Sequence, residues 1–155
     1  MERSLKRGGT TVAQWGYFLN FIYYLGVSIP LVLLGYLLFL WSTPYREIGL
    51  IRAGADTEDD TKVRAAKAAA HDLGGKVLGL VIVVASAIFN SVNLVDLIIW
   101  GVVGILFHLA IFFLFHWFAP FSVLKEIPKG NVAVAIFSSR LHIAAGILMA
   151  ALISY

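Results

Sequence analysis

The chain has 155 residues, of which 60% are hydrophobic and only 14% are charged, and its formal net charge is +3. Soluble domains have about 25% charged residues. The mean hydropathy of +0.87 and apolar blocks longer than ordinary core helices therefore predict a polytopic membrane protein. The absence of cysteine excludes disulfides and thiolate metal sites. The small positive charge lies around the apolar blocks, which suits lipid headgroups better than nucleic acid.

Four apolar segments are long enough to cross a bilayer as helices. We expect these spans at about residues 15–41, 70–91, 94–118 and 131–154. Residues 43–67 form a polar connection between the first two spans, a tight turn at residues 90–93 separates the second and third, and residues 119–130 join the last two. The expected fold is therefore a single all-α membrane domain, 1–155, of four transmembrane helices.

Two helix starts have recognisable capping patterns. Thr57 and Asp60 have the spacing of a capping box, so we expect the second helix to begin in water near Thr57. Asn93 and Asp96 have the N-cap and N3 spacing for the third helix. Asp96 is therefore interpreted as a capping residue rather than a catalytic acid.

The two halves of the chain have a similar pattern. Each has an aromatic-rich span, a polar connection with proline and basic residues, and a span rich in alanine, glycine and serine. Two such pairs in tandem have the same orientation, which predicts a parallel internal repeat of two-helix units rather than an inverted one.

Four segments resemble the YjfL-like family of bacterial inner-membrane proteins. They read YREIGLIRAG from Tyr45, VDLIIWG from Val95, KGNVAVAIF from Lys129 and AGILMAA from Ala145. The resemblance covers about residues 20–155. It implies two helix pairs in the bacterial inner membrane, and it implies no particular reaction.

Polar side chains within the spans are the main candidates for a functional site. Measured from the turn at residues 90–93 at 1.5 Å per residue, several of them lie about 20 Å deep, and Ser28 is expected at a similar depth. The candidate intramembrane polar cluster consists of Asp72, Lys76, His108, Arg140 and His142. Because Arg140 needs a counter-charge or water, we expect a salt bridge between Asp72 and Arg140, within a chain or across a subunit contact.

Three roles are compatible with these residues. They could line a water-accessible or ion-conducting vestibule. They could instead snorkel to the interface and fix helix packing. Two of the four histidines, which are His71, His108, His116 and His142, could also be axial ligands of a haem. No cofactor motif accompanies these histidines, so we expect neither a cofactor nor a metal.

The leading functional interpretation is a small inner-membrane subunit with a structural or partner-binding role, and not an enzyme, because no catalytic motif is present. Its expected partners are the lipid bilayer, further copies of itself and a cytoplasmic protein. The candidate partner-binding loop contains Asp56, Glu58, Asp59 and Asp60. The alternative is a passive ion or small-solute channel or transporter lined by Asp72, Lys76, His108 and Arg140.

The orientation follows from the basic residues. The two long connections carry more lysine and arginine than the residues that precede the first span. The positive-inside rule therefore places both connections, residues 43–67 and 119–130, in the cytoplasm and both termini outside.

Overall fold

The computed structural model describes residues 2–55 and 57–154, with side chains from residue 14 onwards. Every regular element in this part of the chain is a helix. In chain order the helices are α1 (Glu2–Ser42), α2 (Glu47–Ala53), α3 (Asp60–Asn90), α4 (Leu94–Phe118), α5 (Val123–Glu126) and α6 (Val132–Ile153). The prediction of an all-α fold is confirmed.

Four of these helices contain a segment long and apolar enough to cross a membrane. The segments are Gln14–Ser42, Asp60–Asn90, Leu94–Phe118 and Val132–Ile153. The short helices α2 and α5 lie in the two connections, one in each half of the chain. This placement is compatible with an internal repeat, but the repeat stays a prediction.

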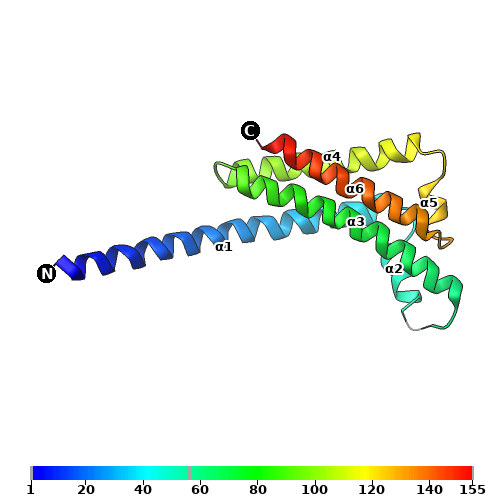
Figure 1. The fold of residues 1–155 in the computed structure, drawn as a ribbon, viewed down its shortest axis with the longest axis horizontal. Coiled ribbons are helices and arrows are strands. Elements are labelled where there is room, and N and C mark those ends of the chain that lie inside the picture. The colour runs from blue at the N-terminus through cyan, green and yellow to red at the C-terminus, as the bar shows by residue number, and fades with distance from the viewer. Residues whose placement is uncertain (1, 56, 155) are drawn as a thin grey trace.

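The second long helix, α3, is the centre of the bundle. It contacts α1, α2, α4 and α6, and in Figure 1 it lies alongside α6 over most of the length of α6. The connections with α2 and α5 are at one end of the bundle, and the α3–α4 turn is at the other end. The packing of α3 therefore determines where the side chains from both connections can meet.

Glycines allow α3 and α6 to approach closely. A Cβ atom at Gly79 would collide with the carbonyl oxygen of His142, and one at Gly75 would collide with the backbone of Ser139. Gly146 packs against the backbone of Gly79 from the opposite helix. Gly75 and Gly79 are four residues apart on one helical face, the spacing that lets two membrane helices pack backbone to backbone.

The first helix extends well beyond the bundle (Figure 1). Tyr24 and Val27 pack against the apolar core, and the path from Tyr24 to Ser42 is about 28 Å at 1.5 Å per residue. That length alone is close to the thickness of the hydrocarbon layer. By contrast, every residue from Gln14 to Tyr23 is exposed. We call residues 14–23 the projecting segment of α1.

The starts of the later helices are capped by short polar side chains. Asp59 caps α3 by accepting hydrogen bonds from the backbone N–H groups of Thr61 and Lys62. The N-cap of α3 is therefore two residues later than the expected N-cap at Thr57, and the hydroxyl of Thr57 instead accepts from the N–H of Asp59. The expected cap of α4 is confirmed, because Asn93 accepts from the N–H of Asp96 at 3.0 Å.

The turn before α6 requires a glycine. Gly130 has φ = +83°, a conformation that residues with a Cβ rarely adopt. It leads directly into Asn131, whose side chain caps α6 by accepting from the N–H of Val134. The Lys129-Gly-Asn segment thus sets the position at which α6 enters the bundle.

Candidate functional site

A buried group of three charged side chains connects α2 to α3. The Lys76 ammonium lies 2.6 Å from Oδ2 of Asp72, one helical turn away on α3, and 3.2 Å from Oε1 of Glu47 at the start of α2. The side chains of all three are at most 1% exposed. We call Glu47, Asp72 and Lys76 the ionic centre.

Hydroxyl groups supply most of the other hydrogen bonds to the ionic centre. Asp72 accepts from the Tyr45 hydroxyl at 2.8 Å and from the Ser138 hydroxyl of α6 at 2.6 Å. Glu47 Oε1 accepts from the Thr43 hydroxyl at 2.7 Å. Burial, and then the charge of Asp72, raise the pKa of Tyr45 far above its ordinary value. Tyr45 is therefore a neutral hydrogen-bond donor at every physiological pH.

One oxygen of the ionic centre differs from the other three carboxylate oxygens. Oε2 of Glu47 is buried and has no hydrogen-bond partner among the described residues. An unpaired buried acceptor is costly, and it is more costly when it carries charge. The ionic centre also contains two carboxyl groups and a single ammonium group, so its charges do not cancel if both acids are ionised.

Two histidines lie next to the ionic centre. The Lys76 ammonium is 4.9 Å from the centroid of the Phe112 ring, and that ring stacks on His142. His142 stacks in turn on His108, with ring centroids 6.1 Å apart and an interplanar angle of 19°. His108 Nε2 is 3.2 Å from the carbonyl oxygen of His142. Because a carbonyl oxygen can only accept, this nitrogen carries the hydrogen and donates the hydrogen bond.

This histidine pair does not have the geometry of haem ligation. Axial ligands point their ring nitrogens at one iron from opposite sides of the porphyrin, whereas His108 and His142 present their ring faces to each other. The other two histidines lie away from the pair, since His71 is exposed and His116 is half-buried near the end of α4. Among the described residues, no group of three or more His, Cys, Asp or Glu side chains could hold a metal ion.

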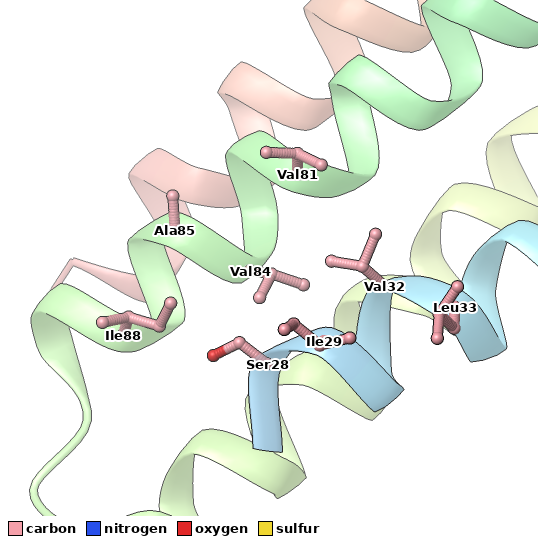
Figure 2. A pocket seen from close by; sticks show the side chains of 8 residues that line it. All are labelled: Ser28, Ile29, Val32, Leu33, Val81, Val84, Ala85 and Ile88. Carbon is pink, nitrogen blue, oxygen red and sulfur yellow. The ribbon is translucent and has the colours of Figure 1, made fainter. Parts of the chain in front are cut away.

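The other half of the bundle, toward the α3–α4 turn, is aliphatic. Its buried core contains Leu31, Leu80, Val84, Ala87, Leu97 and Ile105. Figure 2 shows an apolar cavity of about 300 Å³ between α1 and α3 in this half, with Ser28 on its rim. The expected depth of Ser28 was wrong: it lies beside Val84 and Ile88, and its hydroxyl donates to the carbonyl of Tyr24 at 2.6 Å. Instead Phe39 is the α1 residue that reaches the two histidines.

Arg140 does not join the other members of the candidate cluster. The structure brings Asp72, Lys76, His108 and His142 together in the bundle interior, but Arg140 is exposed. The expected Asp72–Arg140 salt bridge within a chain is therefore wrong. Asp72 is 0% exposed and bonded to Lys76, Tyr45 and Ser138; a salt bridge across a subunit contact stays a prediction.

Helical periodicity explains the position of Arg140. The buried face of α6 contains Ala135, Ser138, Ser139, His142, Ala145, Gly146, Met149 and Ile153. These residues recur at intervals of three or four, the period of one helix face, and Arg140 falls between them. Depth along the helix was a correct guide to the level of Arg140, but not to the direction of its side chain.

The sequence interpretation missed Glu47, Tyr45 and Ser138. Glu47 and Tyr45 belong to the segment that was expected only as a polar connection, whereas both are buried against α3. The available signal was the spacing of Asp72 and Lys76, because a buried lysine in this position needs more than one acceptor. Ser138 lies on the buried face of α6, in a span that was described only as rich in alanine, glycine and serine.

The acidic segment before α3 is partly explained by capping. Asp59 binds the first N–H groups of α3 and pairs with Lys62 at 3.6 Å, and these hydrogen bonds lower the pKa of Asp59. Glu58 and Asp60 are exposed. Asp56, the remaining member of the candidate partner-binding loop, lies outside the described residues.

Comparisons with known proteins agree with this architecture. Residues 12–153 match the family model described as Domain of Unknown Function (DUF350). The chain is 27% identical over 135 residues to the UPF0719 inner membrane protein YjfL of Escherichia coli (strain K12), which covers 86% of this chain and 90% of that protein.

A second relative comes from a different bacterium. The UPF0719 transmembrane protein YshE of Bacillus subtilis (strain 168) is 33% identical over 85 residues, covering 54% of this chain and 63% of YshE. No solved structure matches the chain. The expected resemblance to YjfL-like membrane proteins is confirmed, and the chain belongs to the DUF350 family.

Proposed function

We propose that this protein is a self-associating subunit of the bacterial inner membrane, in which the projecting segment of α1 is the contact between copies. The observation that carries the proposal is the length of α1. Its part from Tyr24 to Ser42 already crosses the bundle, and residues 14–23 extend about 15 Å farther. A helix of this length is accommodated by tilting or kinking, by a locally thicker bilayer, or by a partner that covers it.

The composition of the projecting segment favours a partner. It carries large exposed apolar side chains on all sides, including Trp15, Phe18, Leu19, Phe21 and Ile22. A contiguous apolar surface beside the headgroups is unfavourable when it is left uncovered. A second copy of the same segment would bury this surface in a symmetric helix pair, which is the commonest arrangement in homo-oligomers.

Cysteine cross-linking tests this contact directly, because the chain has no native cysteine. Single cysteines placed in turn at residues 15–23 in nanodiscs should form disulfide-linked dimers at positions that repeat every three or four residues. Leu152→Cys, exposed near the end of α6, is the matched control and should cross-link less. Uniformly weak cross-linking, together with native mass spectrometry showing only the 17.0 kDa chain, would contradict the proposal.

A passive ion or small-solute pathway is the second candidate function. The buried layer of Asp72, Lys76 and His108 supports it, since ionisable side chains inside a membrane bundle are usually functional. The aliphatic half of the bundle opposes a route through a single chain, so a pathway would have to run between copies. Ion flux through proteoliposomes that is lost in Asp72→Asn would favour this candidate over a purely structural subunit.

A cytoplasmic partner remains part of the proposal. Its support is the exposed pair Glu58 and Asp60, which could receive a basic protein surface.

The proposed orientation in the membrane has both connections in the cytoplasm and both termini outside, as the distribution of lysine and arginine favours. Labelling of Ser4→Cys from outside intact cells, and of Thr57→Cys only after permeabilisation, is the expected result. The opposite pattern would reverse the orientation.

A further inference from the structure

The ionic centre contains one negative charge more than it can pair. Glu47 and Asp72 contribute two carboxyl groups, and Lys76 contributes the one ammonium in contact with both. With these side chains at most 1% exposed, water cannot screen the excess. An uncompensated buried charge is normally removed by binding a proton or a cation.

The hydrogen bonds indicate which carboxyl group is neutralised. Asp72 accepts from Lys76, Tyr45 and Ser138, and both of its oxygens have a donor. Glu47 accepts from Lys76 and Thr43, and both donors bind Oε1. Donors favour the ionised form of a carboxyl group. Asp72 is therefore the better-stabilised anion, and Oε2 of Glu47 is the oxygen that lacks a donor.

The side chain of Glu47 lies near one end of the bundle. Glu47 borders a cavity of about 260 Å³, together with Leu40, Arg46, Ile48 and Gly49, at the end that carries the connections. Toward the opposite end, the buried core around Leu80 and Val84 is apolar, and the cavity beside Val84 has no charged lining residue. A small ion could thus reach Glu47 from the side of α2 without crossing the membrane.

We propose that the ionic centre is a proton-binding site, in which Oε2 of Glu47 holds one exchangeable proton while Asp72 remains ionised beside Lys76. The proton comes from a hydronium ion of the solvent: one O–H bond of that ion breaks as the O–H bond of the carboxylic acid forms, and a water molecule is left. This site goes beyond the self-association proposed above and does not depend on it.

The charged and titratable groups around Glu47 come from three parts of the fold. Tyr45 and Arg46 precede it in the chain, with Arg46 exposed at the cavity. Asp72 and Lys76 face it from α3, and His142 of α6 interacts electrostatically with both. With Glu47 neutral, one carboxylate and one ammonium remain in contact, so the buried charges balance.

Infrared spectroscopy of the full chain in nanodiscs tests the site. At neutral pH we expect the C=O stretching band of a protonated carboxyl group. The band should shift when the glutamate side chains are labelled with ¹³C, remain in place when the aspartates are labelled, and vanish in Glu47→Gln. Glu126→Gln, which changes an acid bonded to Lys129 and Asn131 outside the bundle, is the matched control and should keep the band.

Labelling of the unmodified chain keeps the proposal falsifiable even if Glu47→Gln does not fold. No band at neutral pH, or a band that shifts with labelled aspartate, would overturn it. In a second series at constant pH, the cation of the buffer is changed from choline to sodium. A band unchanged by sodium and lost at high pH supports a proton site, whereas a band removed by sodium would show that an alkali cation occupies the position.

Discussion

The two halves of the bundle bury different kinds of side chain. The half toward the α3–α4 turn is filled by aliphatic side chains such as Leu80, Val84 and Leu97, which need no specific partner. The half toward the connections encloses Glu47, Asp72 and Lys76, and each of these needs a partner in a defined position. The aliphatic half is therefore expected to tolerate changes that the polar half does not.

This difference also explains why α2 is part of the bundle rather than a surface element. Lys76 reaches one carboxylate on its own helix and one on α2, and the hydroxyls of Thr43 and Tyr45 add hydrogen bonds from the same connection. The polar half thus attaches a non-spanning segment to a spanning helix.

Removing Lys76 should have the largest effect on the polar half. Lys76→Met leaves two buried carboxyl groups without their shared ammonium, and breaking a buried pair in this way costs about 3–5 kcal/mol of stability. The free energy of unfolding, measured by SDS titration in mixed micelles, checks the prediction. Lys67→Met, an exposed position on the same helix, should change stability by less than about 0.5 kcal/mol. Equal effects at both positions would contradict the role assigned to Lys76.

A methyl group in the α3–α6 contact should have the next largest effect. Gly79→Ala puts a Cβ against the carbonyl oxygen of His142, and overpacking of this kind costs about 1–3 kcal/mol. Gly74→Ala is the matched control, because a Cβ there meets no atom within 4 Å. Alanine should stabilise that helical position by about 0.5–1 kcal/mol. If the free energies of unfolding ranked the two variants in the reverse order, α3 and α6 would not approach as closely as described.

Arg140 provides a smaller test, on the boundary of the polar half. Because Arg140 is exposed and Asp72 is enclosed by other donors, Arg140→Gln should change stability by less than about 0.5 kcal/mol. Its effect should add to that of Asp72→Asn within about 0.5 kcal/mol. A larger coupling energy in this double-mutant cycle would show that Asp72 and Arg140 interact.

The smallest expected effect is at the N-terminus of α3, outside the bundle. Hydrogen bonds from the backbone of Lys62 and Thr61 lower the pKa of Asp59. The cap therefore contributes stability above the ordinary aspartate pKa of about 4, and that contribution is lost as the pH falls through the lower pKa of the folded state. The protection of the Thr61 and Lys62 amides from exchange, measured relative to the intrinsic exchange rate at each pH, should therefore fall in acid.

Two substitutions separate the cap from other effects of acid. Asp59→Asn keeps a side-chain acceptor, so it should remove the pH dependence while preserving protection from exchange. Asp59→Ala should lose protection at every pH. A pH dependence that survives in Asp59→Asn would assign it to another group.

The sequence was sufficient to predict elements that depend on local or periodic signals. The four spans follow from apolar length, and the α4 cap follows from the spacing of Asn93 and Asp96. Four of the residues expected at a common depth are brought together by the fold, because helical rise is nearly constant.

Contacts between segments distant in sequence could not be predicted in the same way. The pairing of Glu47 with Lys76 depends on how α2 folds back on α3, and no local pattern specifies that turn. The depth of Ser28 was wrong because α1 extends beyond the bundle, so the end of its apolar run does not mark the level of the α3–α4 turn. The periodicity of α6 predicts the direction of the Arg140 side chain, whereas depth along the helix does not.

A double-mutant cycle between Glu47 and Lys76 tests most directly whether the ionic centre attaches α2 to the bundle. Unfolding free energies of Glu47→Gln, Lys76→Met and the double variant should be non-additive, with a coupling energy of about 1 kcal/mol or more, as expected for hydrogen-bonded neighbours. Additivity within about 0.3–0.5 kcal/mol, the behaviour of distant independent sites, would show that the two residues do not interact and that α2 is held by other contacts.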